Sequence, residues 1–247
     1  METNLKELIG KHVSLLDGKG FVELIDMMPH PDQDVSGDLA IVNAARVSFM
    51  GDSKGDEKDK KLLFYLLRNK HTSPFEMIEF KFRVRAPLLT WWQWVRHRSF
   101  HYQSVNAQSG RYTPFEENDF YVPDVWRKQS KSNKQASQGE VEHEANDALM
   151  KKLLDHYQQG YALYEEALEA GVSKEMARLF LPGFAVYYTW IVKVDAKNLM
   201  DFIVLRMASD AQYEIRIYAE AIYKEFFKPA LPWTAEAFEE YILKSNE

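Results

Sequence analysis

The sequence EFKFRVRAPLLTWWQWVRHR, residues 79–98, decides the fold of this chain, because two periodicities follow one another in it. Over residues 79–85, the apolar side chains Phe80, Phe82 and Val84 alternate with cationic ones, which is the pattern of a half-buried strand. Pro87 then introduces an apolar run, and we expect a helix over residues 88–98. This helix would present its arginines at its C-terminal end.

Cationic side chains accumulate around this stretch. No acidic residue lies between Glu79 and Glu116, although the whole chain has a formal net charge of −6. The cationic residues in that interval are Lys81, Arg83, Arg85, Arg96, Arg98 and Arg111. Guanidinium groups bind phosphate through paired hydrogen bonds, and the amides and aromatic rings nearby suit a heterocyclic base. The stretch indicates a nucleotide site; a solvated basic loop beside a buried aromatic helix is the alternative.

Composition narrows the class of protein. The chain has 247 residues, of which 46% are apolar and 28% charged, as in globular proteins. No apolar run approaches the ~20 residues that span a bilayer, and residues 1–11 lack a signal-peptide centre, so we expect a cytoplasmic protein without a membrane partner. The absence of cysteine excludes disulfides, thiolate metal sites and a cysteine nucleophile. The low pI of about 5.7 argues against a nucleic-acid-binding face.

Further elements are expected on both sides of the central stretch. Strands are expected at residues 20–26 and 184–194, helices at 57–69, 141–170 and 209–227, and loops at 99–115 and 127–140, the second of them polar and mobile. Expected helix caps are Asp38, Ser73, Ser173 and Asp195, and Thr234 is expected to open the last helix. The pattern indicates a single domain over residues 1–247.

The order of residues after the predicted helix carries a family resemblance. Arg96-His97-Arg98 and, after ten residues, Ser109-Gly110-Arg111 resemble the motif of the flavin-dependent thymidylate synthases, in which seven residues separate Arg-His-Arg from Ser. The chain thus departs from the motif by about three inserted residues, placed most simply within residues 99–103. Five further blocks resemble the family in the same order: GFVELID (20–26), AARVSF (44–49), HTSPFE (71–76), ARLFLP (177–182) and NLMDFIVLR (198–206).

The resemblance implies an α/β fold of the α+β type, with a mixed or antiparallel sheet flanked by helices. It also implies reductive methylation of dUMP to dTMP, with 5,10-methylenetetrahydrofolate as carbon donor, NADPH as reductant and FAD as hydride carrier. The implied assembly is a homotetramer with active sites shared between subunits. No metal is implied.

Site residues also follow from the resemblance. Those implied at FAD are His71, Ser73, Glu76, Arg96, His97, Arg98, Asn106, Ala107, Asp195, Lys197 and Asp201. Those implied at dUMP are Gln93, Arg96, Gln108, Ser109, Gly110, Arg111, Arg178 and Arg206. Arg206, Ser109 and His71 are expected to act in catalysis. Arg206 would hold a fixed positive charge at the pyrimidine ring, where it favours an enolate-like form.

Several positions depart from the family pattern. Ala107 stands where an acidic or amide residue is usual, and Asp195, Lys197 and Asp201 stand where Asn, Arg and Asn are expected. The two carboxylates would repel an anionic reduced flavin unless a cation such as Lys197 compensates. These departures leave UMP or another modified pyrimidine nucleotide as an alternative substrate. A flavin- and nucleotide-binding homologue without catalysis is the rival from another class.

The residues themselves also allow purely structural roles. Arg178 and Arg206 lie in apolar helical stretches, where each could pair with a neighbouring carboxylate such as Glu175 or Asp201. Ser109 has no evident base beside it in the sequence, so it is a poor candidate for a nucleophile.

Overall fold

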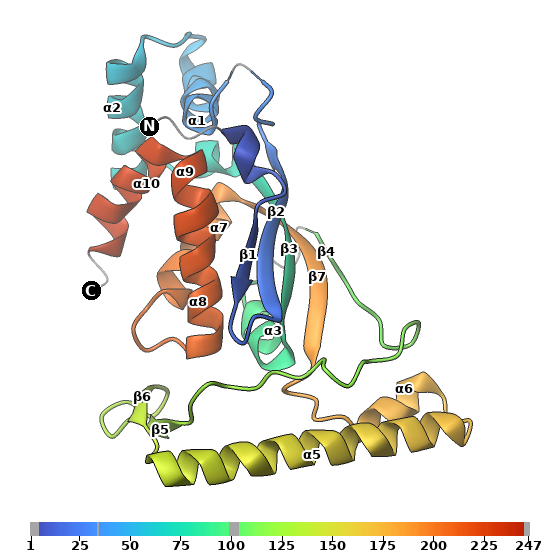
Figure 1. Cartoon of the computed structure of the whole chain (residues 1–247). Coiled ribbons are helices and arrows are strands. Elements are labelled where there is room, and N and C mark those ends of the chain that lie inside the picture. The colour runs from blue at the N-terminus through green and yellow to red at the C-terminus, as the bar shows by residue number, and fades with distance from the viewer. Residues whose placement is uncertain (1–4, 34, 99–103, 245–247) are drawn as a thin grey trace.

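The computed structural model describes residues 5–33, 35–98 and 104–244. Its centre is a five-stranded antiparallel sheet in the order β1-β2-β3-β7-β4 (Figure 1). The strands are β1 (His12–Leu15), β2 (Gly20–Met28), β3 (Glu79–Pro87), β7 (Tyr187–Asp195) and β4 (Val105–Ala107). The expected antiparallel sheet flanked by helices is confirmed.

Strand β3 lies in the middle of the sheet and pairs with β2 and β7. Phe80, Phe82 and Val84 are fully buried in the main core, whereas Lys81 and Arg83 are exposed on the other face. The alternation read from the sequence is therefore confirmed, and the strand extends two residues further, to Pro87.

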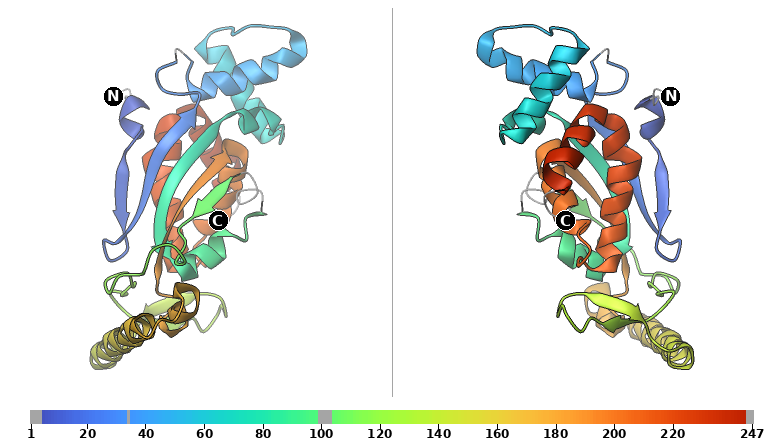
Figure 2. Two further views of the ribbon diagram at one scale, coloured as in Figure 1. Left: turned by 90° about the vertical axis from the view of Figure 1, so that its right-hand side faces the viewer. Right: turned by 90° about the vertical axis from the view of Figure 1, so that its left-hand side faces the viewer.

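Helices lie on one face of this sheet and at its two ends. They are α1 (Gly37–Arg46), α2 (Asp56–Arg68), α3 (Leu88–Trp94), α7 (Ala196–Arg206), α8 (Tyr213–Ile222), α9 (Lys228–Ala230) and α10 (Pro232–Phe238). Helices α7, α8, α9 and α10 lie beside the face, α1 and α2 beyond one end, and α3 at the other (Figure 1). A π-helical turn over Tyr223–Phe227 joins α8 to α9, and another follows α10 over Glu239–Leu243. The other face of the sheet is towards the viewer in the left view of Figure 2, with α8 and α10 behind it.

The long helix α5 (His143–Glu169) lies apart from the sheet as an arm across one of its ends (Figure 1). After α5 in the sequence, α6 (Lys174–Ala177) and the short turn Arg178–Phe180 fold back over the arm. Phe115, Phe120, Tyr157 and Tyr164 form a second, smaller core there. At Gly160 the arm passes so close to the turn that a Cβ would lie 2.9 Å from the carbonyl oxygen of Phe180.

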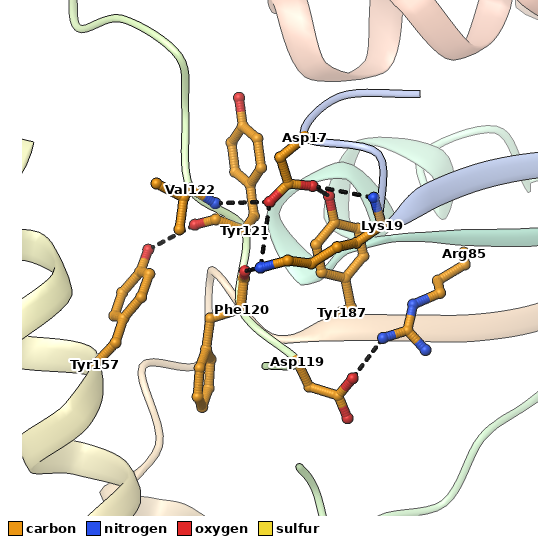
Figure 3. A network of polar contacts seen from close by, with 9 residues as sticks. All are labelled: Asp17, Lys19, Arg85, Asp119, Phe120, Tyr121, Val122, Tyr157 and Tyr187. Atoms are coloured by element: carbon orange, nitrogen blue, oxygen red, sulfur yellow. Dashed lines mark hydrogen bonds and ion pairs between the residues drawn. The ribbon is translucent and has the colours of Figure 1, made fainter. Parts of the chain in front are cut away.

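A polar network fastens the chain between the sheet and the arm (Figure 3). The Asp17 carboxylate accepts hydrogen bonds from the Tyr187 hydroxyl and from the backbone N–H of Val122. Tyr121, the residue before Val122, is bound from the arm: the Tyr157 hydroxyl of α5 donates to the carbonyl of Tyr121 at 2.9 Å. Burial and the Asp17 carboxylate raise the pKa of Tyr187, so its hydroxyl stays a donor.

Several predicted elements are confirmed and others differ. The strand at 20–26, the helices at 57–69 and 141–170 and the Asp195 cap are confirmed. The helix expected over 88–98 ends at Trp94, and the helix expected from residue 209 begins at Tyr213. The loop expected over 99–115 contains β4, which has only three residues and exists through pairing with β7. Segment 127–140 forms a hairpin of β5 (Arg127–Gln129) and β6 (Ser137–Glu140); its mobility stays a prediction.

The cap expected at Asp38 is placed differently. Ser36, not Asp38, caps α1, because the buried Asp38 carboxylate instead accepts the backbone N–H of Trp233 and Thr234, at 2.7 and 3.0 Å. Asp38 thus serves the start of α10, where Thr234 lies inside the first turn rather than ahead of it.

Two further caps lack the expected hydrogen bond. Thr72, not Ser73, holds the N-cap of the 3₁₀ turn Ser73–Met77, and its side chain makes no capping bond. Ser173 does hold the N-cap of α6, but without a side-chain bond. In the described ranges no helix is both long enough and apolar enough to cross a bilayer.

Candidate functional site

The guanidinium of Arg206, at the end of α7, is held by three acceptors. Its Nε donates to Nε2 of His97 at 2.7 Å, Nη1 to the side-chain oxygen of Gln93 at 3.0 Å and Nη2 to the backbone carbonyl of Gln93 at 3.1 Å. Gln93 lies in the last turn of α3, and its backbone carbonyl also accepts the backbone N–H of Arg96 at 3.3 Å. The structure thus brings together Gln93 and Arg206, which were expected at dUMP, with His97, which was expected at FAD, and Arg206 does not pair with Asp201.

His97 is a neutral acceptor in this arrangement. Burial, and next the charge of Arg206, lower the pKa of His97 from 6.5 to about 4. Because Nε2 accepts from Arg206, the proton of the neutral ring lies on Nδ1. The ring also packs edge-on against Phe202, with the centroids 4.9 Å apart. His97 therefore fixes the guanidinium without adding a second charge.

Residues expected at the flavin gather along the start of α7. Asp195 is buried and caps the helix, accepting from the backbone N–H of Asn198 at 2.8 Å. Lys197 forms an ion pair with Asp201 one turn later, at 2.8 Å, and the Asp201 contact, followed by the charges of Asp195 and Glu76, raises the pKa of Lys197. Of the two carboxylates that replace amides, Asp201 has Lys197 as its cation, whereas Asp195 is held by Asn198.

The turn carrying His71, Ser73 and Glu76 lies beside the same end of α7. Its continuation is tied there by a hydrogen bond from the backbone N–H of Ala196 to the carbonyl of Ile78, at 2.9 Å. All three side chains are exposed. They are therefore available to a ligand bound next to Lys197.

A second cluster lies near the arm. The Arg111 guanidinium contacts the Glu175 carboxylate at 3.1 Å, and Arg178 donates to the backbone carbonyl of Glu175, also at 3.1 Å. Arg178 is thus exposed and not bound to the Glu175 carboxylate, contrary to the structural alternative. Ser109 accepts the backbone N–H of Arg111 at 3.3 Å, and among the described residues no base contacts its hydroxyl.

Gly110 has a packing reason to be glycine. A Cβ at this position would lie 2.5 Å from the ring of Phe115, which is buried. The close approach of a phosphate, expected from the sequence, stays a prediction. Asn106 lies on β4 opposite Ile191, Ala107 is opposite Trp190, and Gln108 continues from the strand with a backbone bond to Thr189.

The local cationic excess is smaller than the sequence suggested. Arg83 pairs with Glu23, Arg85 with Asp119 and Arg111 with Glu175. Within the described ranges, Arg96 and Arg98 have no carboxylate partner, and both are exposed. With the exposed Lys81, they remain candidates to bind an anion, and the three inserted residues expected within 99–103 lie outside the described residues.

Helix α3 separates two cavities. Gln93 and Arg206 line one of about 1300 Å³, whereas Trp91, Trp92 and Arg178 line another of about 430 Å³, to which Gly110 also contributes. The residues expected at dUMP thus line two different cavities of the same chain. In the described part of the chain no group of three or more His, Asp or Glu side chains is arranged to hold a metal ion.

Sequence reasoning missed three residues beside Gln93. Gln212 and Glu214 begin α8, and Arg127 comes from the hairpin; all three line the larger cavity with Gln93. The sequence offers little signal for them, because Glu214 resembles an ordinary acidic residue in a first helical turn.

Comparisons with known proteins agree with this geometry. Residues 23–233 match the family model described as "Thymidylate synthase complementing protein". A flavin-dependent thymidylate synthase of Thermus thermophilus is 46% identical over 232 residues, which cover 94% of this chain and 80% of that protein. The enzyme of the same name from Thermotoga neapolitana is 41% identical over 234 residues, covering 95% and 97%.

Solved structures extend the comparison to the fold. The UMP/dUMP methylase PolB from Streptomyces cacaoi, bound with 5-Br dUMP, is similar with a TM-score of 0.76 and 30% identity over 89% of this chain and 94% of that one. Its complex with 5-Br UMP is similar with a TM-score of 0.75 and 31% identity, over 89% and 93%.

The lowered pKa of His97 makes the free energy of unfolding depend on pH. Because the folded state favours neutral His97, this residue stabilises the fold above pH 6.5, and that contribution is lost as the pH falls from 6.5 towards about 4. We expect the free energy of unfolding to fall less over this interval in His97→Gln than in the wild type. Denaturant titrations at several pH values measure this, and an NMR titration of His97 near pH 6.5 would contradict it.

Proposed function

The chain belongs to the family of flavin-dependent thymidylate synthases, and from this premise we propose that the residues around Arg206, Arg96 and Arg178 form its active site. The enzyme converts dUMP, 5,10-methylenetetrahydrofolate, NADPH and a proton to dTMP, tetrahydrofolate and NADP⁺. FAD, when bound, carries the hydride between NADPH and the methylene group. The observation that carries the site assignment is the guanidinium of Arg206, held by His97 and Gln93.

The side chains fit a bound FAD. Its diphosphate needs cations, and Arg96 and Arg98 are exposed cations without a carboxylate partner in the described ranges. The exposed turn with His71, Ser73 and Glu76 lies at the start of α7, and Asn106 and Ala107 lie on the edge strand β4. Asp201 is neutralised by Lys197, and the buried Asp195 accepts from the backbone N–H of Asn198, so each of the two carboxylates has a donor within the chain.

Arg206 acts on the pyrimidine by electrostatics. A guanidinium has five N–H groups, and three of them are used by His97 and Gln93. Among the described residues, one N–H on each terminal nitrogen of Arg206 has no acceptor. These two N–H groups can donate side by side to a carbonyl oxygen and a ring nitrogen of the pyrimidine. Such a fixed charge favours the enolate-like form of the ring and raises electron density at C5, an effect worth about 10²- to 10³-fold per donor.

The substrate is a pyrimidine nucleotide, and dUMP is favoured over UMP. The relatives named thymidylate synthase are 46% and 41% identical, whereas the methylase described for both UMP and dUMP is 30–31% identical. The alternative of a homologue without catalysis has no support from these names. The cytoplasmic location stays a prediction.

The nucleotide site is completed by a second copy of the chain in this proposal. Arg178 and Gly110 line a different cavity from Gln93 and Arg206, so one chain does not gather all the residues assigned to dUMP. Large apolar side chains beside Arg178 are exposed, with Leu179 at 74% and Phe184 at 72%. Exposed apolar patches mark protein interfaces. These observations support a site in which Arg178, Ser109, Gly110 and Arg111 of one subunit meet Arg206 of another, and the homotetramer itself is proposed from the family.

The absorbance of the purified protein tests the reaction itself. Bound FAD gives a band near 450 nm, and we expect NADPH to bleach it anaerobically, faster when dUMP is present than when UMP replaces it. A colourless protein that does not take up FAD would overturn the proposal.

Ser109→Ala tests the absence of a protein nucleophile. Because no base contacts the Ser109 hydroxyl in the described residues, we expect a weaker affinity for dUMP with measurable turnover. Titration with dUMP and single-turnover assays separate the two effects. Complete loss of product formation with dUMP still bound would contradict this role.

Mixing two inactive variants tests the shared site. Arg178→Ala and Arg206→Ala assemblies should each lack activity. In mixed assemblies, an intact Arg178 can meet an intact Arg206 across subunits, so activity should return when differently tagged chains are dissociated together and reassembled. Each variant reassembled with itself is the control. Mixed assemblies that co-purify but stay inactive would place both arginines in the same subunit's site.

A further inference from the structure

A chain of hydrogen bonds runs from Arg206 into the start of α8. The side-chain oxygen of Gln93 accepts from Arg206 Nη1 at 3.0 Å, and Nε2 of Gln93 donates to Oε1 of Gln212 at 3.3 Å. Nε2 of Gln212 in turn donates to Oε2 of Glu214 at 3.0 Å. Two amides thus lie in series between a guanidinium and a carboxylate.

The two ends of this series of hydrogen bonds, Arg206 and Glu214, determine which group donates at each step. A guanidinium only donates hydrogen bonds and an ionised carboxylate only accepts them, whereas an amide does either, depending on which way it is turned. Glu214 therefore requires the NH₂ group of Gln212, which leaves the oxygen of Gln212 for Gln93. Gln93 must then offer its NH₂ group to Gln212 and its oxygen to Arg206. Neither amide can turn over without placing two donors or two acceptors opposite each other.

Glu214 is itself held in one position. It is 5% exposed, and its other oxygen, Oε1, forms an ion pair with Arg127 and accepts from the Tyr121 hydroxyl at 3.4 Å. Arg127 stacks on the ring of Tyr213, 4.6 Å from its centroid. Burial, followed by the charge of Glu214, raises the pKa of Tyr121, so its hydroxyl remains a donor. Both partners of Oε1 are donors, so Oε2 is left to Gln212.

We propose that Glu214, acting through Gln212, is a positioning residue for the pyrimidine site: it fixes the side-chain oxygen of Gln93 against Arg206 and so sets the plane of the guanidinium. The inference rests on the proposed function of Arg206 at the pyrimidine. It adds to that function the two residues, Gln212 and Glu214, that decide how the guanidinium is presented.

Replacing the Glu214 carboxylate by an amide of the same shape reverses the direction of the hydrogen bonds of this series between position 214 and Gln93. In Glu214→Gln, the donors Arg127 and Tyr121 keep the new amide oxygen on their side, so its NH₂ group faces Gln212. Gln212 then turns its oxygen to position 214 and its NH₂ group to Gln93. Gln93 is left with its own NH₂ group towards Arg206, and the bond to the guanidinium is lost. We expect the affinity of the FAD-loaded enzyme for dUMP to fall about tenfold, equivalent to ~1.4 kcal/mol.

A second substitution restores the original direction. In the double variant Glu214→Gln with Gln212→Glu, the carboxylate at position 212 accepts from the amide at 214 and from Gln93. Gln93 again presents its oxygen to Arg206, and the net charge equals that of the wild type. We expect dUMP affinity to recover to within about twofold of the wild type, a difference of under ~0.5 kcal/mol.

Two further variants complete the experiment. Glu220→Gln makes the same chemical change on the same helix, where the Glu220 carboxylate forms ion pairs with Arg216 and Lys224, at 3.9 and 4.0 Å. It should leave dUMP affinity unchanged. Gln212→Leu removes the connection without adding charge, and should weaken dUMP binding even if Glu214→Gln fails to fold. Calorimetric titration with dUMP and thermal unfolding are measured for every variant.

The outcomes separate this inference from the proposed function. If Glu214→Gln weakens dUMP binding and the double variant does not recover it, Glu214 acts through its charge on the hairpin and the inference is wrong. It is also wrong if Gln212→Leu binds dUMP as the wild type does. If Arg206→Ala itself leaves dUMP affinity unchanged, the proposed nucleotide site fails instead.

Discussion

Strand β3 is hydrogen-bonded along both edges, and the position of the site follows from that constraint. Its inward residues are committed to the core, so the chain leaves it in a fixed direction into α3 and places Gln93. Its antiparallel neighbour β7 leads into α7 at the opposite end of the sheet. Helix α7 then returns about 16 Å, at ~1.5 Å per residue, and its last residue, Arg206, reaches α3. Two helices that leave opposite ends of the sheet thus meet at one guanidinium.

Elements with strong local periodicity could be predicted from the sequence. The alternation over residues 79–85 and the long apolar stripe of α5 each determine their structure locally, and Asp195 caps α7 through a hydrogen bond only three residues away. The candidate site could be predicted in part for a similar reason. Gln93 and His97 are only four residues apart, in the last turn of α3 and just after it, and both bond to Arg206 once α3 and α7 are in place.

The remainder depends on partners that are distant in the sequence. Arg83 pairs with Glu23, 60 residues away, and Arg85 with Asp119, 34 residues away, so the cationic excess counted along the chain is partly neutralised in the fold. Asp38 was expected to cap its own helix but serves α10, almost 200 residues later. Strand β4 is too short to show a period. No local pattern contains this information, because each of these contacts is created by the sheet and the helices packed on it.

The glycine at the tightest point of the arm has an evolutionary consequence. Within an isolated helix, Gly160 is less favourable than alanine by about 1 kcal/mol, so mutation to alanine would strengthen α5. The added methyl group would, however, press against the carbonyl of Phe180, in the same short turn as Arg178. Selection for a stable helix and selection for the placement of that arginine therefore oppose each other at position 160. A lineage that drifts to alanine there must also remodel the turn.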